Sequence, residues 1–504
     1  MVSSHNNSAG PCVLDDDCLG LVLAFVPSGS REAFLVSHLS RRLRSLALLT
    51  PTLWSHLTWW DQTIYDVREH QTMQSAFYTM LHRAGPTIDL SLEIHATRQV
   101  SVSTSSRSQL PKALWAHNFF ERVVRLALFT NLEVHTWSPG AELTEILQAR
   151  MPRLTDLNLR LGSDAPYDLH LNASNLPTLQ RLSARGRDSM ISRGSTVWPH
   201  VRFAELAAHL FDESLGDILA VFPNLDHLKL WEKPYRWSYS SSPMPIDGHA
   251  LRRLDIVRAR GHETRTLISQ LGKQILDIEE LGLLYIVAPF DSEFTDILGL
   301  APDPAIGTQA VLLRVSITGN EMVFPGTECR LAHAEYQSRV HEEHGLGIYV
   351  SLSHTFADDR TRVRRARTPH FGVAVNLTVA ALRASARQYS PEVPVEVEMD
   401  SQTGWRLLFS ACKRADNSLL AQVERIVIRV PSNHGSLFPM PRSIGIRASP
   451  PVPKLKELVF KSEIGGHVRV PADVLQEFIS RFADLPESPQ VVLIGVLVEN
   501  MHSA

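Results

Sequence analysis

The residues of this 504-residue chain that come closest to a reactive site are His341, Glu342, Glu343 and His344, its only tight group of histidine and acidic side chains. A zinc hydrolase needs H-E-x-x-H, which places two histidine ligands on one helical face with a glutamate base between them. Here the histidines are three residues apart, so we interpret the group as a solvated helix end. The phosphate-binding, dinucleotide-binding and nucleophile-elbow motifs are also absent. We therefore predict no enzyme, no catalytic residue, no cofactor and no metal.

A second chemically distinctive stretch is the basic run from Arg360 to Arg367, which follows Asp358 and Asp359. Such a run could bind an acidic partner or act as a nuclear-import signal. Charge runs of this length are also common in solvated loops, and we favour a solvated loop between two strands.

Bulk composition excludes several classes of protein. Charged residues make up 20% of the chain and the net charge is −3, so we expect no nucleic acid and no membrane among its partners. No apolar run approaches a transmembrane helix, and the polar N-terminus lacks the pattern of a secretory signal. The 4 cysteines form no CxxC pair, which indicates a reducing compartment. We expect a cytoplasmic or nuclear protein.

Three short amphipathic patterns follow one another between positions 14 and 57. The first has Leu19, Val22, Leu23 and Val26 at helical spacing, and the acidic run 15–17 supplies its N-cap and first-turn charge. A second begins near residue 30, and a third follows residue 37 and ends before a proline at position 51. Three helices of this size cannot bury their apolar surface among themselves. They must pack on the rest of the chain or dock on another protein.

Beyond position 86, an apolar residue, two spacers, an apolar residue, one spacer and a third apolar residue recur. The first positions of successive copies between Val123 and Leu312 lie 22 to 34 residues apart. This spacing is typical of leucine-rich repeats, in which each unit buries its strand by stacking on its neighbours. The alternative is an α/β domain whose strands resemble one another by coincidence. Between 313 and 422 the pattern fades; we predict strands at 348–352, 371–378 and 393–399, and helices at 379–387 and 404–412.

The N-terminal residues carry a family resemblance. The segments that matter are Leu14-Asp15-Asp16-Asp17-Cys18-Leu19, Phe25-Val26, Val36-Ser37-His38-Leu39-Ser40-Arg41-Arg42-Leu43 and Thr50-Pro51-Thr52-Leu53-Trp54. Together they resemble the F-box, most closely that of the large F-box families of mushroom-forming fungi. Asp15 stands where the family usually has proline, and Leu43 where it usually has tryptophan.

The repeat pattern and the resemblance together predict a fold class, α+β or an α/β repeat. Its parts would be an N-terminal three-helix F-box-like bundle and an irregular leucine-rich-repeat-like solenoid. The expected domains are a disordered N-terminus at 1–12, the F-box-like domain at 13–58, a connecting helix at 59–85 and a substrate-binding array at 86–500.

The resemblance also implies a function, the substrate-recognition subunit of an SCF-type ubiquitin ligase. The F-box would dock on a Skp-type adaptor, and through it on a cullin, while the array holds an unknown protein substrate. The residues matched to the adaptor-binding face are Leu14, Cys18, Leu19, Val36, Leu39, Arg42 and Leu43. The alternative is a non-catalytic protein-interaction scaffold not linked to ubiquitination.

Overall fold

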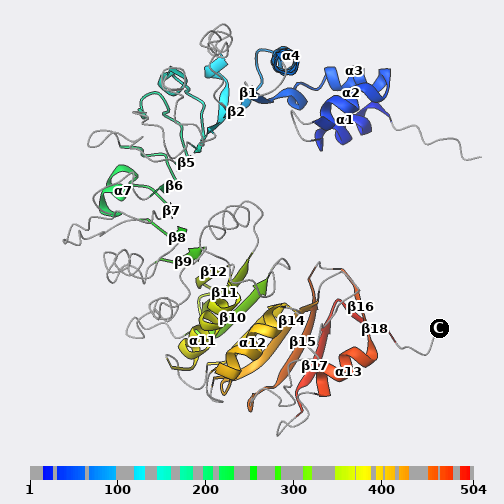
Figure 1. The fold of residues 1–504 in the computed structure, drawn as a ribbon, viewed down its shortest axis with the longest axis vertical. Coiled ribbons are helices and arrows are strands. Elements are labelled where there is room, and N and C mark those ends of the chain that lie inside the picture. The colour runs from blue at the N-terminus through cyan, green and yellow to red at the C-terminus, as the bar shows by residue number, and fades with distance from the viewer. Residues whose placement is uncertain are drawn as a thin grey trace, which may run out of the picture. The chain divides into compact units, whose positions relative to one another are not determined.

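The computed structural model (Figure 1) describes part of the chain. The described residues are 15–26, 31–62, 67–97, 119–130, 145–160, 171–185, 197–207, 215–231, 250–257, 278–284, 310–319, 347–368, 370–387, 393–400, 403–414, 419–430, 452–463, 466–480 and 488–499. The histidine and glutamate group at 341–344 lies outside them.

Within the described residues, 16 of the strands form one mostly parallel sheet, so the fold is of the α/β type. The strand order is β1-β2-β3-β4-β5-β6-β7-β8-β9-β12-β11-β10-β13-β14-β15-β17, and a separate pair joins β16 and β18. The predicted fold class, a three-helix F-box-like bundle followed by a leucine-rich-repeat-like solenoid, is therefore wrong.

The physical reason lies in the strand pairing. Units that stack one after another keep their strands in chain order, but here β9 pairs with β12, and β10 pairs in parallel with β13. Between them, β11 pairs antiparallel with both β10 and β12. The three-position apolar pattern marks any strand with one buried face, so it cannot distinguish stacked repeats from a crossed-over sheet.

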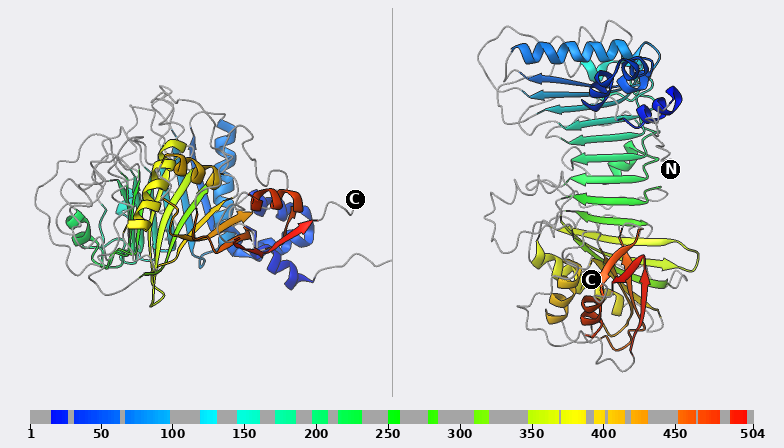
Figure 2. Two further views of the ribbon diagram at one scale, coloured as in Figure 1. Left: turned by 90° about the horizontal axis from the view of Figure 1, so that it is seen from below. Right: turned by 90° about the vertical axis from the view of Figure 1, so that its right-hand side faces the viewer.

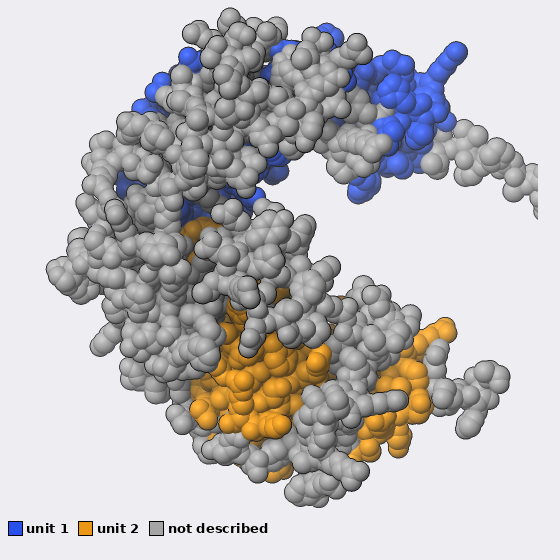
Figure 3. All heavy atoms as spheres, viewed as in Figure 1, with its two compact units in different colours: residues 1–212, 217–225 blue, residues 213–216, 226–504 orange. Residues whose placement is uncertain are grey.

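The chain divides into two compact units, coloured separately in Figure 3. One comprises residues 1–212 and 217–225, and the other comprises 213–216 and 226–504.

The first unit begins with three short helices, α1 (Asp16–Ala24), α2 (Arg31–Leu39) and α3 (Arg41–Leu48). The 3₁₀ helix η1 (Pro51–Trp54) follows, and α4 (Val67–Ala84) packs on η1 and β1. A second 3₁₀ helix, η2, covers Phe119–Glu121. The six strands are β1 (His56–Gln62), β2 (Leu90–Thr97), β3 (Val123–Thr130), β4 (Asp156–Arg160), β5 (Arg181–Arg185) and β6 (Phe203–Ala207).

Strands β3 to β5 coincide with copies of the three-position apolar pattern. In β4, Leu157 and Leu159 are buried and their neighbours are more exposed. The alternation puts apolar side chains on one face of the sheet and polar side chains on the other.

The second unit contains the remaining strands. They are β7 (His227–Trp231), β8 (Arg253–Val257), β9 (Glu280–Leu284), β10 (Ala310–Gly319), β11 (Ile348–Phe356), β12 (Thr361–Thr368), β13 (Val395–Asp400), β14 (Val423–Val430), β15 (Glu457–Ser462), β16 (Val468–Pro471), β17 (Gln490–Ile494) and β18 (Val496–Glu499). The helices are α7 (Leu215–Val221), which straddles the boundary, then α11 (Phe371–Arg387), α12 (Thr403–Arg414) and α13 (Ala472–Ser480).

Helices α11 and α12 lie side by side on one face of strands β10 to β13 (Figure 2). This face is apolar; β10, for example, contributes Leu313, Val315 and Ile317, all fully buried. Helix α13 joins the same core, because Phe478 contacts Trp405 of α12 and Phe460 of β15. The helices therefore cover the apolar face, and the opposite face of these strands bears the polar side chains.

Two local predictions in this unit are wrong. Residues 371–378, predicted as a strand, form the first half of α11. The basic run 360–367, predicted as a solvated loop, is largely strand β12, and Arg364 within it is buried. Arg364 Nη1 donates a hydrogen bond to the Ile278 carbonyl at 2.9 Å, so a backbone acceptor replaces water beside this buried guanidinium.

Candidate functional site

The predicted adaptor-binding residues are differently exposed in the structure. Cys18, Leu39 and Arg42 are exposed, whereas Leu19, Val36 and Leu43 are half-buried. Leu14 lies outside the described residues. Arg42 forms an ion pair with Asp16 at 2.6 Å, which ties α3 to α1.

The two departures from the F-box pattern have local explanations. Asp15 is the N-cap of α1, and its Oδ1 accepts a hydrogen bond from the Cys18 amide at 2.7 Å. This backbone hydrogen bond lowers the pKa of Asp15. Leu43 receives no such role; its amide donates to Ser40 Oγ, the N-cap of α3, and its side chain is half-buried. Asp15 therefore serves its own helix, whereas the leucine at position 43 has no structural explanation.

Several of the most exposed apolar side chains near α1 to α3 are not among the predicted adaptor-binding residues. Phe25 is 85% exposed, Leu49 76%, Leu39 71% and Leu21 66%. Val22, Leu35 and Leu48 are exposed as well. Helical periodicity identifies the apolar residues that face the core of a helix. Leu21 and Phe25 lie outside that periodic set. The signal that could have found them is an apolar residue that does not fit the helical spacing. An apolar surface of this kind is typical of a docking face.

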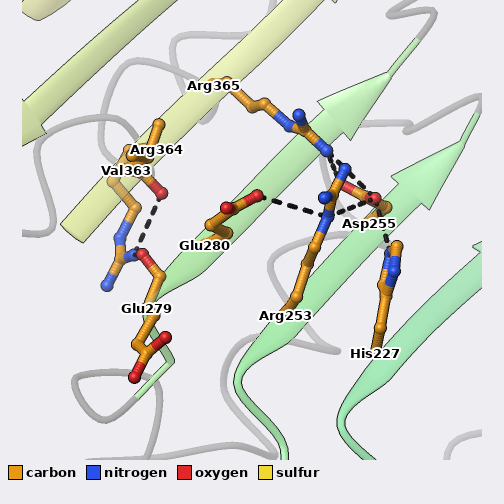
Figure 4. Close-up of polar contacts among 8 residues, drawn as sticks. All are labelled: His227, Arg253, Asp255, Glu279, Glu280, Val363, Arg364 and Arg365. Atoms are coloured by element: carbon orange, nitrogen blue, oxygen red, sulfur yellow. Dashed lines mark hydrogen bonds and ion pairs between the residues drawn. The ribbon is translucent and has the colours of Figure 1, made fainter. Parts of the chain in front are cut away.

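The polar face of the second unit contains a buried carboxylate surrounded by two arginines and a histidine, a group that we call the Asp255 cluster (Figure 4). It consists of His227 on β7, Arg253 and Asp255 on β8, and Arg365 on β12. Asp255 lies 2.8 Å from His227 Nε2 and 3.1 Å from Arg253 Nε, and accepts a hydrogen bond from Arg365 Nη2 at 2.8 Å. Gly282 of β9 leaves space for the Asp255 carboxylate, because a Cβ at position 282 would lie 2.0 Å from Asp255 Oδ1.

The electrostatics of the Asp255 cluster favour a structural role over acid–base chemistry. Burial raises the pKa of Asp255, but the His227 hydrogen bond and the charges of Arg365 and Arg253 outweigh it and lower the pKa overall. The carboxylate therefore stays ionised and its oxygens are already engaged. It cannot exchange a proton near neutral pH, but it holds the surrounding cations in fixed positions.

A second group, the Glu396 cluster, lies on the same face of the second unit. It consists of Arg314 on β10, Glu396 and Glu398 on β13, and Arg425 and Arg429 on β14. Glu396 accepts from Arg314 Nε at 2.5 Å and from Arg425 Nη1 at 3.1 Å, and Glu398 accepts from Arg429 Nε at 2.7 Å. Register places these side chains together, since Arg314, Glu396 and Arg425 are Cα partners across neighbouring strands.

The polar face of the first unit has its own charged group. The Glu93 carboxylate on β2 contacts the His95 ring and lies 3.5 Å from His56 Nε2, and His95 stacks on Phe129 of β3. No group of three or more potential metal ligands is found among the residues that the structure describes. This group therefore offers polar contact surface.

No protein-family model matches this chain, and a search of curated proteins likewise found no match. Within the described part of the chain, no helix has both the length and the apolar character needed to cross a bilayer.

Proposed function

We propose that this chain is the substrate-recognition subunit of an SCF-type ubiquitin ligase. Helices α1 to α3 would dock on a Skp-type adaptor, and the polar face of the sheet would hold the target protein. The observation that carries the proposal is a set of exposed apolar side chains on and beside helices α1 to α3, among them Leu21, Phe25, Leu39 and Leu49. It belongs to the segment whose residues resemble the F-box.

The energetics of the N-terminal helices support docking on a partner. Each exposed leucine or phenylalanine would gain roughly 1.5–3 kcal/mol on full burial. Several of these side chains would contribute together to the free energy of binding if a partner with an apolar groove covered them. The chain itself performs no chemistry in this proposal; it brings the target close to the ubiquitin-charged enzyme and orients it.

The test is retention of a purified Skp-type adaptor by the full-length protein. We expect wild-type protein to bind, and Leu39→Asp or Phe25→Asp to weaken binding by at least about tenfold, because either change places a charge in an apolar interface. Both side chains are exposed, so the folded state should tolerate the substitutions.

Val197→Asp is the matched control, since Val197 is 53% exposed and precedes β6, away from the three helices in the chain. It should bind like wild type. If wild-type protein does not retain the adaptor, the ligase proposal fails and a scaffold not linked to ubiquitination becomes the better explanation. If Leu39→Asp and Phe25→Asp both bind like wild type, the docking face has been placed wrongly.

A further inference from the structure

In the Asp255 and Glu396 clusters, the carboxylates are buried and the guanidinium groups that pair with them are partly exposed. The side chains of Asp255, Glu396 and Glu398 are 2%, 3% and 8% exposed. The arginines that pair with them are far more exposed, from 27% for Arg365 to 43% for Arg314. The polar face of the second unit therefore buries three of its carboxylates and presents their arginines to a partner, beside the partly exposed Glu280 and Glu457.

The buried carboxylates also pre-organise the arginines. Glu396 engages Arg314 through Nε, and Glu398 engages Arg429 through Nε. A guanidinium has five N–H donors in a planar fork, so one bond to the supporting carboxylate leaves donors for a second acceptor. An arginine already held in place loses less conformational entropy when it binds a second carboxylate.

A strip of small hydroxyl side chains lies between the two clusters. Ser351 and Ser353 of β11 are register partners of β12 and β10 residues, and Ser316 of β10 pairs with Ser351. Arg365 on β12 and Arg314 on β10 are two strands apart, roughly 10 Å by the usual strand spacing. Successive side chains on one side of an extended peptide lie roughly 7 Å apart, so such a peptide can reach both clusters.

We infer that the polar face of the second unit binds an extended, glutamate- or aspartate-rich segment of a protein. The inference rests on the proposed function, because it names the class of target segment that the receptor would hold. A nucleic acid fits less well. Its uniform phosphate charge would lie against the partly exposed Glu280 and Glu457, whereas a peptide can place its spaced carboxylates at the arginines alone.

The test measures binding of the full-length protein, without adaptor, to a fluorescein-labelled peptide of alternating glutamate and serine, about ten residues long. The comparison probes are a lysine–serine peptide and a single-stranded oligonucleotide of equal length. We expect binding of the acidic peptide only, weakened by added salt.

Two variants locate the binding face. Arg314→Gln removes a guanidinium above Glu396, and Lys461→Glu reverses an exposed charge on β15, whose Cα partner on β14 is Arg429. Each should weaken acidic-peptide binding by about tenfold. Lys461→Glu touches no buried carboxylate of the two clusters, so it remains informative if Arg314→Gln folds poorly.

Lys456→Gln is the matched control, because Lys456 pairs with Glu424 at 2.7 Å outside both clusters. Its binding should stay within about twofold of wild type. Equal binding of both peptides, tighter binding of the oligonucleotide, no binding of the acidic peptide, or wild-type affinity in both face variants would overturn the inference. Because the adaptor is absent, such a result leaves the adaptor experiment unaffected, and the two failures are distinguishable.

Discussion

His354 in β11 is a buried histidine whose surroundings oppose protonation. Burial, together with the nearby positive charges of Arg364 and Arg362, lowers its pKa to about 3. In the unfolded chain the imidazole would titrate near its ordinary value of 6.5. Between these two values the unfolded state binds more protons than the folded state, so stability is complete above pH 6.5 and falls as the pH drops toward 3.

We therefore expect His354→Phe to make the second unit less sensitive to acid. Between pH 7 and pH 5, protonation of unfolded His354 should cost about 2 kcal/mol in the free energy of unfolding, and the variant should lack this loss. Urea unfolding at both pH values measures the difference. The lowered pKa of Asp255 has no effect in this range, because its ordinary value is 3.8. An identical pH dependence in the wild type and the variant would contradict the assignment.

At the scale of single elements, the Asp255 cluster depends on a glycine in the neighbouring strand. A Cβ at position 282 would lie 2.0 Å from Asp255 Oδ1 and 3.1 Å from Arg365 Nε. We expect Gly282→Ala to displace the carboxylate from its cations and to lower the free energy of unfolding by about 3 kcal/mol, measured by urea unfolding.

The control is Gly372→Ala in α11, where a Cβ would meet nothing within 4 Å. Alanine is the better helix former, so this variant should be as stable as wild type or slightly more stable. If both alanine variants behave alike, the close approach at Gly282 is not what maintains the cluster.

The elements also show how far the sequence could predict the structure. Strands such as β3 and β4 can be predicted from the local sequence, because a strand with one buried face has an apolar residue at every second position. Their partners do not follow, since the antiparallel path of β11 depends on contacts distant in the sequence. In α11, Val373, Ala374, Val375 and Leu377 are all buried. Such a continuous apolar run with β-branched residues is equally typical of a strand.

The candidate sites were predictable to a similar extent. The docking role of the N-terminal segment stays a prediction from its residues, and the exposure of Leu21, Phe25 and Leu49 is visible only in the structure. The basic run at 360–367 was noticed as a possible site for an acidic partner. Its interpretation as a solvated loop was wrong, because the partner of Arg365 is Asp255, 110 residues away in the chain. Pairs at this separation leave no local pattern.

At the scale of the whole molecule, the proposed adaptor-docking face and the proposed acidic-segment face belong to different compact units. Residues such as Leu39 and Phe25 lie in the first unit, whereas Arg314 and Lys461 lie in the second. Substitutions that share no partner have nearly additive effects on free energy. The two binding activities should therefore be separable by mutation.

The decisive protein is the double variant Leu39→Asp with Lys461→Glu, compared with both single variants. We expect Leu39→Asp to lose adaptor retention and keep acidic-peptide binding, and Lys461→Glu to do the reverse. The double variant should show both losses, each within about twofold of the corresponding single variant. Adaptor retention and peptide anisotropy, measured on the same preparations, give all the values. If Leu39→Asp also abolished peptide binding while the protein stayed folded, the two faces would be coupled, and a receptor with independent docking and target-holding surfaces would be the wrong description.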